Sequence, residues 1–268
     1  MEKEKVAVAY LGELYSYHYL AALKHFGIQN DFISSNSFDE LINKVANAEC
    51  NYGIIAVENS LAGFVEDQLA QKTNIQRIIE SKLAVIAELF FPIHLQLVAL
   101  KNLPLEEIDT IYTHHVAKEE ASVFLESIGE KHFEITQSTS SGIKIISEAK
   151  LYKAAAIGNK EAALHYGLQI IKENIDNHHQ NITRFFVISL NAVHDENTTK
   201  LHNKTSLLIS HSDKSMLDKK EAIKVHGYEW MYDEIIWKTK SEKNKQMSRL
   251  NDMFEEVKEL WTFQESAI

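Results

Sequence analysis

The side chains best suited to chemistry in this sequence are hydroxyls and amides that follow predicted strands. Ser, Thr and Asn are also good helix N-caps, so each segment taken singly has a purely structural interpretation. Taken together, backbone N–H groups, hydroxyls and helix dipoles at several helix starts predict a site that holds a small anion and offers no strong nucleophile. The four segments comprise residues 12–16, 58–60, 113–114 and 138–140.

Residue patterns for other chemistries are weak or missing. Cys50 precedes a turn with no cation or helix start beside it, which is typical of an inert buried thiol. The pairs His114-His115 and His178-His179 are adjacent in the chain, so they lack the spacing of metal ligands. The sequence contains no glycine-rich phosphate loop and no dinucleotide fingerprint.

Composition limits the class of protein. The chain has 268 residues, of which 45% are hydrophobic and 25% are charged, so it can fold around a substantial core. Its formal net charge of -10 disfavours binding to nucleic acid or to anionic membranes. We expect no signal peptide and no membrane-spanning segment. The single cysteine fits a reducing compartment, and we expect a cytoplasmic protein.

The elements that would position these groups alternate between strands and helices through the first two thirds of the chain. Two such series, divided near Ser81, predict an α/β fold of two lobes with largely parallel sheets and a ligand site between the lobes. The expected strands comprise residues 6–11, 31–33, 54–57, 83–91, 93–100, 108–112, 133–136, 154–157 and 183–190. The expected helices comprise 16–26, a helix capped by Ser37, 117–128, 141–149 and a helix capped by Asn159.

The last quarter of the chain has a different character. Residues 191–203 are polar and predict a linker, 204–210 and 228–237 have strand patterns, and 244–261 predicts one helix. An apolar stripe along that helix indicates a packing or dimer face rather than a membrane or cofactor surface. The stripe comprises Met247, Leu250, Met253, Phe254, Val257 and Leu260.

Seven short segments, in order, resemble those of the prephenate dehydratase family. Any one of them is weak evidence, but this many in the right order are strong. The resemblance covers roughly residues 5–192, and the Asn-x-Thr-Arg-Phe signature at 181–185 is intact. The segments comprise 8–12, 57–60 with Gly63, Glu88 with Pro92 and Ile93, 113–115, 138–140, 156–168 and 181–185.

The resemblance implies a fold similar to that of type II periplasmic binding proteins, with a cleft between two α/β lobes. The catalytic domain would comprise residues 1–192, with lobe 1 at about 1–79 and 183–192 and lobe 2 at about 80–180. A linker at 193–203 would lead to a small α+β ACT-like region at 204–268. We also expect a homodimer or homotetramer.

The family reaction converts prephenate to phenylpyruvate with release of water and carbon dioxide, and it needs no cofactor. By resemblance, the catalytic residues are Thr183, Arg184 and Asn59. Thr183 donates a proton to the departing hydroxyl, and Asn59 would form a hydrogen bond with the substrate. Arg184 would bind a carboxylate or brace the site; its alternative role is a structural salt bridge. Because threonine is a weak acid, most of the barrier reduction would come from orientation and electrostatics. The residues implied to bind substrate are Ser16, Ser60, Thr113, Glu120, Ser138, Thr139, Asn181 and Phe185.

The chain departs from the family pattern in its first turn, at one acid and in its tail. Tyr15 replaces a glycine, which limits close approach of the backbone to a ligand. Glu120 stands where the family has glutamine, and its charge would weaken binding of a dianion unless it is protonated or turned away. The signatures of the family's phenylalanine site are missing, and one strand of the βαββαβ order is not found. We therefore expect a degenerate ACT-like region, used for dimerisation, with weak or no response to phenylalanine.

Two other functions remain open. One is a prephenate decarboxylase that keeps the hydroxyl and does not aromatise the ring, although the intact Thr183 argues against it. The other is a non-catalytic binder of small anions, because the altered turn at Tyr15 and the acid at Glu120 would fit a loss of catalysis.

Overall fold

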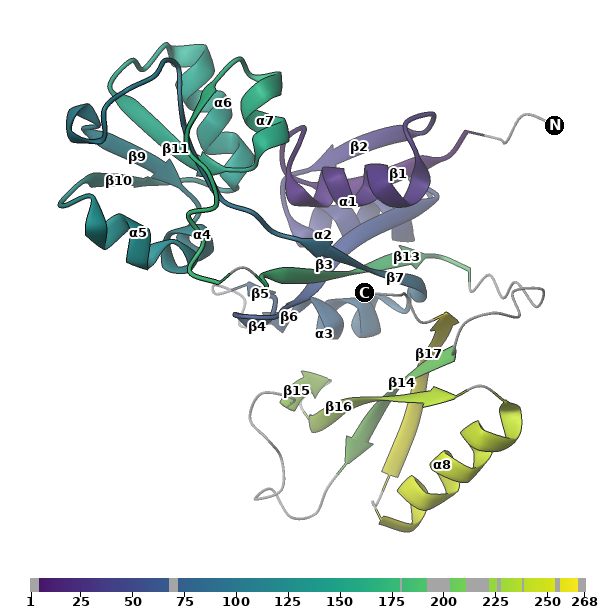
Figure 1. The fold of residues 1–268 in the computed structure, drawn as a ribbon. Helices are drawn as coiled ribbons and strands as arrows, with labels where there is room; N and C mark the ends of the chain where they lie inside the picture. Colours follow the sequence, from purple (N-terminus) through teal and green to yellow (C-terminus); the bar gives the residue numbers. More distant parts are fainter. Residues whose placement is uncertain are drawn as a thin grey trace.

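The protein has an α/β fold of two lobes with an additional C-terminal region, as Figure 1 shows. This confirms the two-lobed α/β class expected from the sequence, but the expectation of largely parallel sheets was wrong, because both large sheets contain parallel and antiparallel pairs. The computed structural model describes residues 5–67, 72–178, 180–191, 203–210, 222–225, 228–237, 239–253 and 256–264. Within these ranges the strands form a ten-stranded, a five-stranded and a two-stranded sheet.

Lobe 1 is a sheet covered by helices on both faces. Helix α1 covers one face, where Ala21 and Ala22 pack on Phe185, and α2 and α3 cover the other, where Leu41 and Ile75 belong to the same core cluster as Phe186. We refer to these as the α1 face and the α2–α3 face. The elements of lobe 1 are β1 (Ala7–Leu11), α1 (Tyr17–Phe26), β2 (Asp31–Ser35), α2 (Phe38–Ala46), β3 (Tyr52–Asn59), β4 (Gly63–Phe64), β5 (Glu66–Asp67), β6 (Lys72–Thr73), α3 (Asn74–Ser81), β7 (Ala84–Pro92) and β13 (Ile182–Ser189).

Lobe 2 contains the five-stranded sheet, whose order is β10-β9-β11-β8-β12. Its central strand β11 has the sequence AAAIG and is buried along its whole length, which is typical of a strand covered on both faces. The elements of lobe 2 are β8 (Gln96–Ala99), the 3-10 helix η1 (Leu105–Glu107), β9 (Thr110–Thr113), α4 (His115–Glu120), α5 (Ser122–Ser127), β10 (His132–Ile135), α6 (Thr139–Ala149), β11 (Ala154–Gly158), α7 (Lys160–His165) and β12 (Gln169–Lys172).

The chain crosses between the lobes later than the sequence suggests. Residues from 80 onward were expected in lobe 2, but β7 pairs antiparallel with β13 from Ala84 to Pro92 in the sheet of lobe 1. The apolar sequence of β7 is stable in this position because helices cover both faces of the lobe 1 sheet. The two crossings therefore lie just after Pro92 and just before Ile182.

The helix expected at 117–128 is interrupted and forms α4 and α5 instead. In a continuous helix the N–H of Val123 would donate to the carbonyl of Glu119. The side chain of Asn177 stands between them, because its Oδ1 accepts from Val123 N at 3.0 Å and its Nδ2 donates to Glu119 O at 3.1 Å. An inserted side chain of this kind breaks a helix at the point where it replaces the backbone bond.

The C-terminal region also differs from the expectation. The helix expected at 244–261 ends at Met253, and β17 follows it, so the strand thought to be missing is present. Met247 and Leu250 pack from α8 against the strands, and Val257 packs against the same cluster from β17, whereas Leu260 packs against the core cluster that contains Phe186. Phe254 lies outside the described residues, so the predicted single stripe is divided between two elements and two faces of the sheet. The elements are β14 (Asn203–Ser210), β15 (Ala222–Val225), β16 (Tyr228–Trp237), α8 (Lys240–Met253) and β17 (Glu256–Gln264).

The C-terminal region shares a sheet and a core with lobe 1. Strand β17 runs parallel to β7, and the sheet continues in the order β15-β16-β14-β17-β7-β13-β3-β1-β2. Tyr232 and Phe263 are buried in the core cluster that contains Phe186, and Trp261 Nε1 donates to Leu83 O at 3.1 Å. Of the expected linker, residues 193–202 lie outside the described residues, and residue 203 begins β14.

Candidate active site

Three side chains of the two predicted motifs form one hydrogen-bonded cluster at the point where the chain returns to lobe 1. Thr183 on β13 lies directly opposite Asn59, the last residue of β3. Asn59 Nδ2 donates to Asn181 Oδ1 at 2.7 Å and to Thr183 Oγ1 at 3.1 Å. All three residues are buried. Because Thr183 accepts this bond, its own O–H remains available to donate to a substrate.

The orientation of the Asn59 amide is fixed from its other end. Its Oδ1 accepts from the backbone N–H groups of Leu61 at 2.8 Å and Ala62 at 3.0 Å. Ser60 fastens the same turn to β13, since its Oγ donates to Gln180 O and accepts from Ile182 N, each at 3.0 Å. Ser60 thus holds the site together and is itself exposed.

Glu120 lies beside this cluster, at the end of α4. Its side chain closely approaches Asn181, although Asn181 Nδ2 makes no aligned hydrogen bond among the described residues. Burial raises the pKa of Glu120, the contact with Asn181 partly offsets this, and the charges of Asp176 and Glu119 raise it again. Glu120 in turn contributes to the raised pKa of Tyr17, whose main cause is burial.

Two helix starts from different lobes meet at Gly12. Ser16 is the N-cap of α1 and Ser138 is the N-cap of α6. A Cβ at Gly12 would lie 3.5 Å from Ser16 Cβ and 3.7 Å from Ser138 Oγ, and the glycine has φ +89°. Thr139 is the first residue of α6. The partial positive ends of both helices are thus directed at the first turn of the chain.

Three residues that were predicted to bind substrate make contacts within the fold instead. The Ser16 hydroxyl accepts from Tyr19 N and donates to Leu11 O at 2.9 Å. The Thr113 hydroxyl donates to His114 O at 3.1 Å, and Thr113 is fully buried. Phe185 belongs to the core on the α1 face and is also fully buried. These contacts favour structural roles for their side chains.

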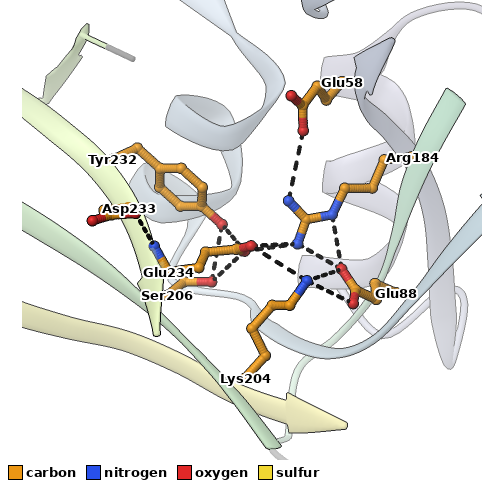
Figure 2. Close-up of polar contacts among 8 residues, drawn as sticks. All are labelled: Glu58, Glu88, Arg184, Lys204, Ser206, Tyr232, Asp233 and Glu234. Atoms are coloured by element: carbon orange, nitrogen blue, oxygen red, sulfur yellow. Dashed lines mark hydrogen bonds and ion pairs between the residues drawn. The ribbon is translucent and has the colours of Figure 1, made fainter. Parts of the chain in front are cut away.

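Arg184 is not brought together with Thr183. Successive strand residues point to opposite faces of a sheet, so Thr183 and Phe185 lie on the α1 face and Arg184 and Phe186 on the α2–α3 face. Figure 2 shows the Arg184 guanidinium within a cluster of charged side chains. It contacts Glu88 at 2.6 Å, Glu234 at 2.7 Å and Glu58 at 3.7 Å.

The charged cluster joins lobe 1 to the C-terminal region. Lys204 Nζ of β14 lies 2.9 Å from Glu88 Oε1, and the Glu88 side chain is fully buried. Burial alone would lower the pKa of Arg184, but the charges of Glu234 and Glu88 raise it above its usual value. Burial would raise the pKa of Glu234, whereas Arg184 and Lys204 bring it below its usual value. Both shifts favour the charged forms of Arg184 and Glu234.

The sequence patterns did not predict this cluster because its charges are far apart in the chain. They also did not indicate His18, whose Nε2 accepts from Ala56 N at 3.2 Å and whose pKa is lowered to about 3 by burial. Glu88 was noted only as part of a family segment. Its signal was a single acid inside an otherwise apolar strand, a position that requires a buried partner.

Tyr15 has a left-handed backbone conformation, with φ 62°, which favours glycine. Its carbonyl accepts from Asn159 Nδ2 of lobe 2 at 2.7 Å, and its ring lies 4.5 Å from that of His165. Lys144 and Glu13 form a second bridge at 3.0 Å between the lobes. Of these contacts between the lobes, only the one between the Tyr15 ring and His165 would be lost with a glycine, because the others do not involve the Tyr15 side chain.

We expect Tyr15→Gly to be more stable than Tyr15→Ala by about 1 kcal/mol. Both variants lose the ring, but only alanine keeps a Cβ in the left-handed conformation, which costs roughly 1 kcal/mol. Both should be less stable than the wild type, because burial of the ring outweighs that strain. Urea unfolding of the three proteins measures the order. An alanine variant as stable as the glycine variant would show that a Cβ in the left-handed conformation at residue 15 does not lower stability.

Among the residues that the structure describes, no group of three or more His, Cys, Asp or Glu side chains gathers as a metal site would require. None of the described helices combines the length and apolar character needed to cross a bilayer. The ring centroids of His114 and His115 lie 4.1 Å apart with the planes tilted by 47°, and His179 lies outside the described residues.

Comparison with known proteins agrees with this fold and these motifs. The family model described as Prephenate dehydratase matches residues 8–193. A bifunctional chorismate mutase/prephenate dehydratase of Buchnera aphidicola subsp. Schizaphis graminum is 28% identical over 212 residues, which cover 77% of this chain and 52% of that protein. The corresponding protein of Escherichia coli K12 is 29% identical over 76% of this chain and 51% of its own length. The chain thus spans about half the length of these curated relatives.

Two solved structures share the fold over nearly the whole chain. Prephenate dehydratase from Arthrobacter aurescens, in complex with L-Phe, has a TM-score of 0.77 at 19% identity and covers 98% of this chain and 92% of its own. GqqA, described as a novel type of quorum quenching acylases, has a TM-score of 0.77 at 20% identity and covers 97% of this chain and 98% of its own. At these identities the likeness shows the fold alone. The match of the family model over residues 8–193, with its motif residues joined in the Asn59–Asn181–Thr183 cluster, shows that the chain belongs to the prephenate dehydratase family.

Proposed function

We propose that this chain is a prephenate dehydratase, which converts prephenate to phenylpyruvate, water and carbon dioxide in phenylalanine biosynthesis. Membership of the family supports the reaction. The observation that carries the proposal is the bond from Asn59 Nδ2 to Thr183 Oγ1, at 3.1 Å, inside the signature segment. The other activity named for the bifunctional relatives is not part of the proposal.

The reaction breaks two bonds while the ring becomes aromatic. The bond from the ring to the departing carboxylate breaks, carbon dioxide leaves, and the electron pair moves through the ring to expel the hydroxyl on the opposite carbon. The hydroxyl takes the proton of Thr183 and leaves as water, and solvent returns a proton to Thr183. Asn59 holds the threonine in position and stabilises the negative charge that develops on its oxygen.

Binding of a dianion is supported by the two helix starts at Gly12. The chain is acidic, so attraction for the substrate must be local rather than general. The N-termini of α1 and α6, with Ser138 and Thr139 at the second of them, provide positive potential and N–H groups for a carboxylate. Arg184 has no part in this binding in the proposal, because its guanidinium is paired on the opposite face.

Incubation of the purified protein with prephenate tests the proposal. Formation of phenylpyruvate, followed by its absorbance in alkali and by product mass, is the expected result. A product that has lost carbon dioxide but kept the hydroxyl would indicate a decarboxylase without aromatisation. Binding of prephenate by well-folded protein without any product would indicate an anion-binding homologue.

The rate should fall as the pH rises through the raised pKa of Glu120. Above that pKa the carboxylate would repel the substrate, whereas the neutral acid, favoured below it, would not. Glu120→Gln keeps the shape without the charge, so it should remove this alkaline limb and equal or exceed wild-type kcat/KM at high pH. A profile of kcat/KM against pH for both proteins provides the measurement. An unchanged limb in the variant would assign it to another group.

We also propose a cytoplasmic enzyme that acts as a homodimer or homotetramer through the ACT-like region at 204–268. Strand β15 is at the end of the ten-stranded sheet, and an edge of this kind supports pairing with a second copy. The catalytic domain at 1–192 and a weak or absent phenylalanine response belong to the same proposal. Sedimentation measures the oligomeric state, and its comparison with and without phenylalanine measures the response of that state to phenylalanine.

A further inference from the structure

The charged cluster on the α2–α3 face lies directly behind the proposed catalytic residues. Thr183 is opposite Asn59, and the next rung of the same two strands pairs Arg184 with Glu58. Glu88 lies opposite Phe186 on β7, two residues along β13 from Arg184 on the same face. Arg184 therefore ties together three neighbouring strands one rung away from the Thr183–Asn59 pair.

The backbone ladder is irregular at this point. The register between β13 and β3 shifts between Arg184 and Phe185, so that Val57 is an extra residue on β3. A bulge disrupts regular pairing and re-aims nearby side chains. The position of β13 against β3 then depends more on side-chain contacts than on backbone pairing. The charged side-chain contacts at this rung are those of Arg184.

The C-terminal region supplies half of the buried charge in the cluster. Arg184 and Glu88 belong to lobe 1, whereas Lys204 of β14 and Glu234 of β16 belong to the C-terminal region. Glu234 receives Arg184 Nη2 at 2.7 and 2.9 Å, Tyr232 Oη at 2.7 Å and Ser206 Oγ at 3.1 Å. The four groups are two basic and two acidic side chains, and Glu58 at the rim is half-exposed.

We infer that Glu234 and Lys204 of the C-terminal region are positioning residues for Thr183, because they complete the charge balance that holds Arg184 and β13 in place. The inference rests on the proposed function where it concerns turnover. The C-terminal region is then part of the structure that aligns the proton donor, in addition to any role in assembly.

The consequence of losing Glu234 follows from the charges that remain. Glutamine keeps nearly the same shape and one acceptor oxygen, but Glu234→Gln removes the negative charge and places an N–H donor where the second oxygen accepts from Arg184. Arg184 and Lys204 then share the fully buried Glu88, and their mutual repulsion displaces Arg184 and its rung. Removing the charge of Lys204 as well leaves the Arg184–Glu88 pair balanced.

The test compares the wild type with Glu234→Gln, with Glu234→Gln combined with Lys204→Met, and with Glu259→Gln. Glu259 pairs with Lys243 at 2.5 Å within the C-terminal region, so its variant removes an ion pair there without touching the cluster. Two readouts are used on folded protein at 25 °C: kcat and KM for prephenate, and hydrogen exchange of the amides at 182–186.

We expect Glu234→Gln to lower kcat on the order of tenfold or more with little change in KM, as a small misplacement of a catalytic group does. Exchange at 182–186 should quicken, and the double variant should recover both quantities. Glu259→Gln should match the wild type. Unchanged kcat and exchange in Glu234→Gln, or equal losses in Glu259→Gln, would overturn the inference. If the wild type itself does not convert prephenate, the proposed function fails, and exchange alone decides whether the cluster holds β13.

Discussion

Replacing Thr183 by valine is expected to lower kcat for prephenate by about 10²–10³-fold, the usual loss when one donor that stabilises developing charge is removed. Valine has nearly the shape of threonine, so β13 and the packing around it should survive. The hydroxyl that accepts from Asn59 Nδ2 at 3.1 Å is lost, and with it the proton for the leaving group. KM should change little, because the missing interaction acts mainly in the transition state.

Steady-state kinetics and circular dichroism together measure this effect. Thr183→Ser keeps the hydroxyl and provides the matched control, with activity expected much nearer to that of the wild type. The stability of Thr183→Val should fall by only about 1 kcal/mol, the net contribution of one hydrogen bond. A folded valine variant with near wild-type kcat would show that the proton comes from another group, and Glu120 would then be the first acid to test.

Replacing Glu88 by glutamine is expected to destabilise the protein by about 3–5 kcal/mol, as is usual when one member of a buried ion pair is removed. The Glu88 side chain is fully buried, and it contacts both Arg184, at 2.6 Å, and Lys204, at 2.9 Å. Without it, two buried cations face Glu234, which is partly exposed, and Glu58 at the rim. Because desolvation of both cations is no longer offset, the loss exceeds that of a neutral hydrogen bond.

Urea unfolding measures this difference in the free energy of unfolding. Glu256→Gln is the control: its carboxylate pairs with Lys258 at 3.0 Å, both side chains are about half exposed, and the change should stay within about 0.5 kcal/mol. Equal small losses in both variants would mean that the cluster around Glu88 contributes no more than a surface pair.

Much of the fold could be read from patterns among neighbouring residues. The strand at 228–237 and the cap of α1 by Ser16 agree with the structure, because strand alternation and N-cap bonds involve residues close in sequence. The helix expected at 244–261 was wrong only beyond Met253, where the spacing of Val257 with its apolar neighbours fits a helical stripe but pairing with β14 forms a strand. The interrupted helix at 117–128 depends on Asn177, more than fifty residues away.

The sequence by itself determined the family, the two-lobed α/β class and the segments that hold Asn59, Asn181 and Thr183. These depend on ordered motifs and on the period of apolar residues. Only the tertiary structure decided the face on which each motif residue lies. Thr183 and Arg184 are neighbours in the chain, yet the alternation of a strand turns one toward Asn59 and the other toward acids 96 and 50 residues away. Ion pairs between distant segments produce no repeating pattern in the sequence. The pairing of Arg184 with these acids could therefore be identified only from the arrangement of the strands.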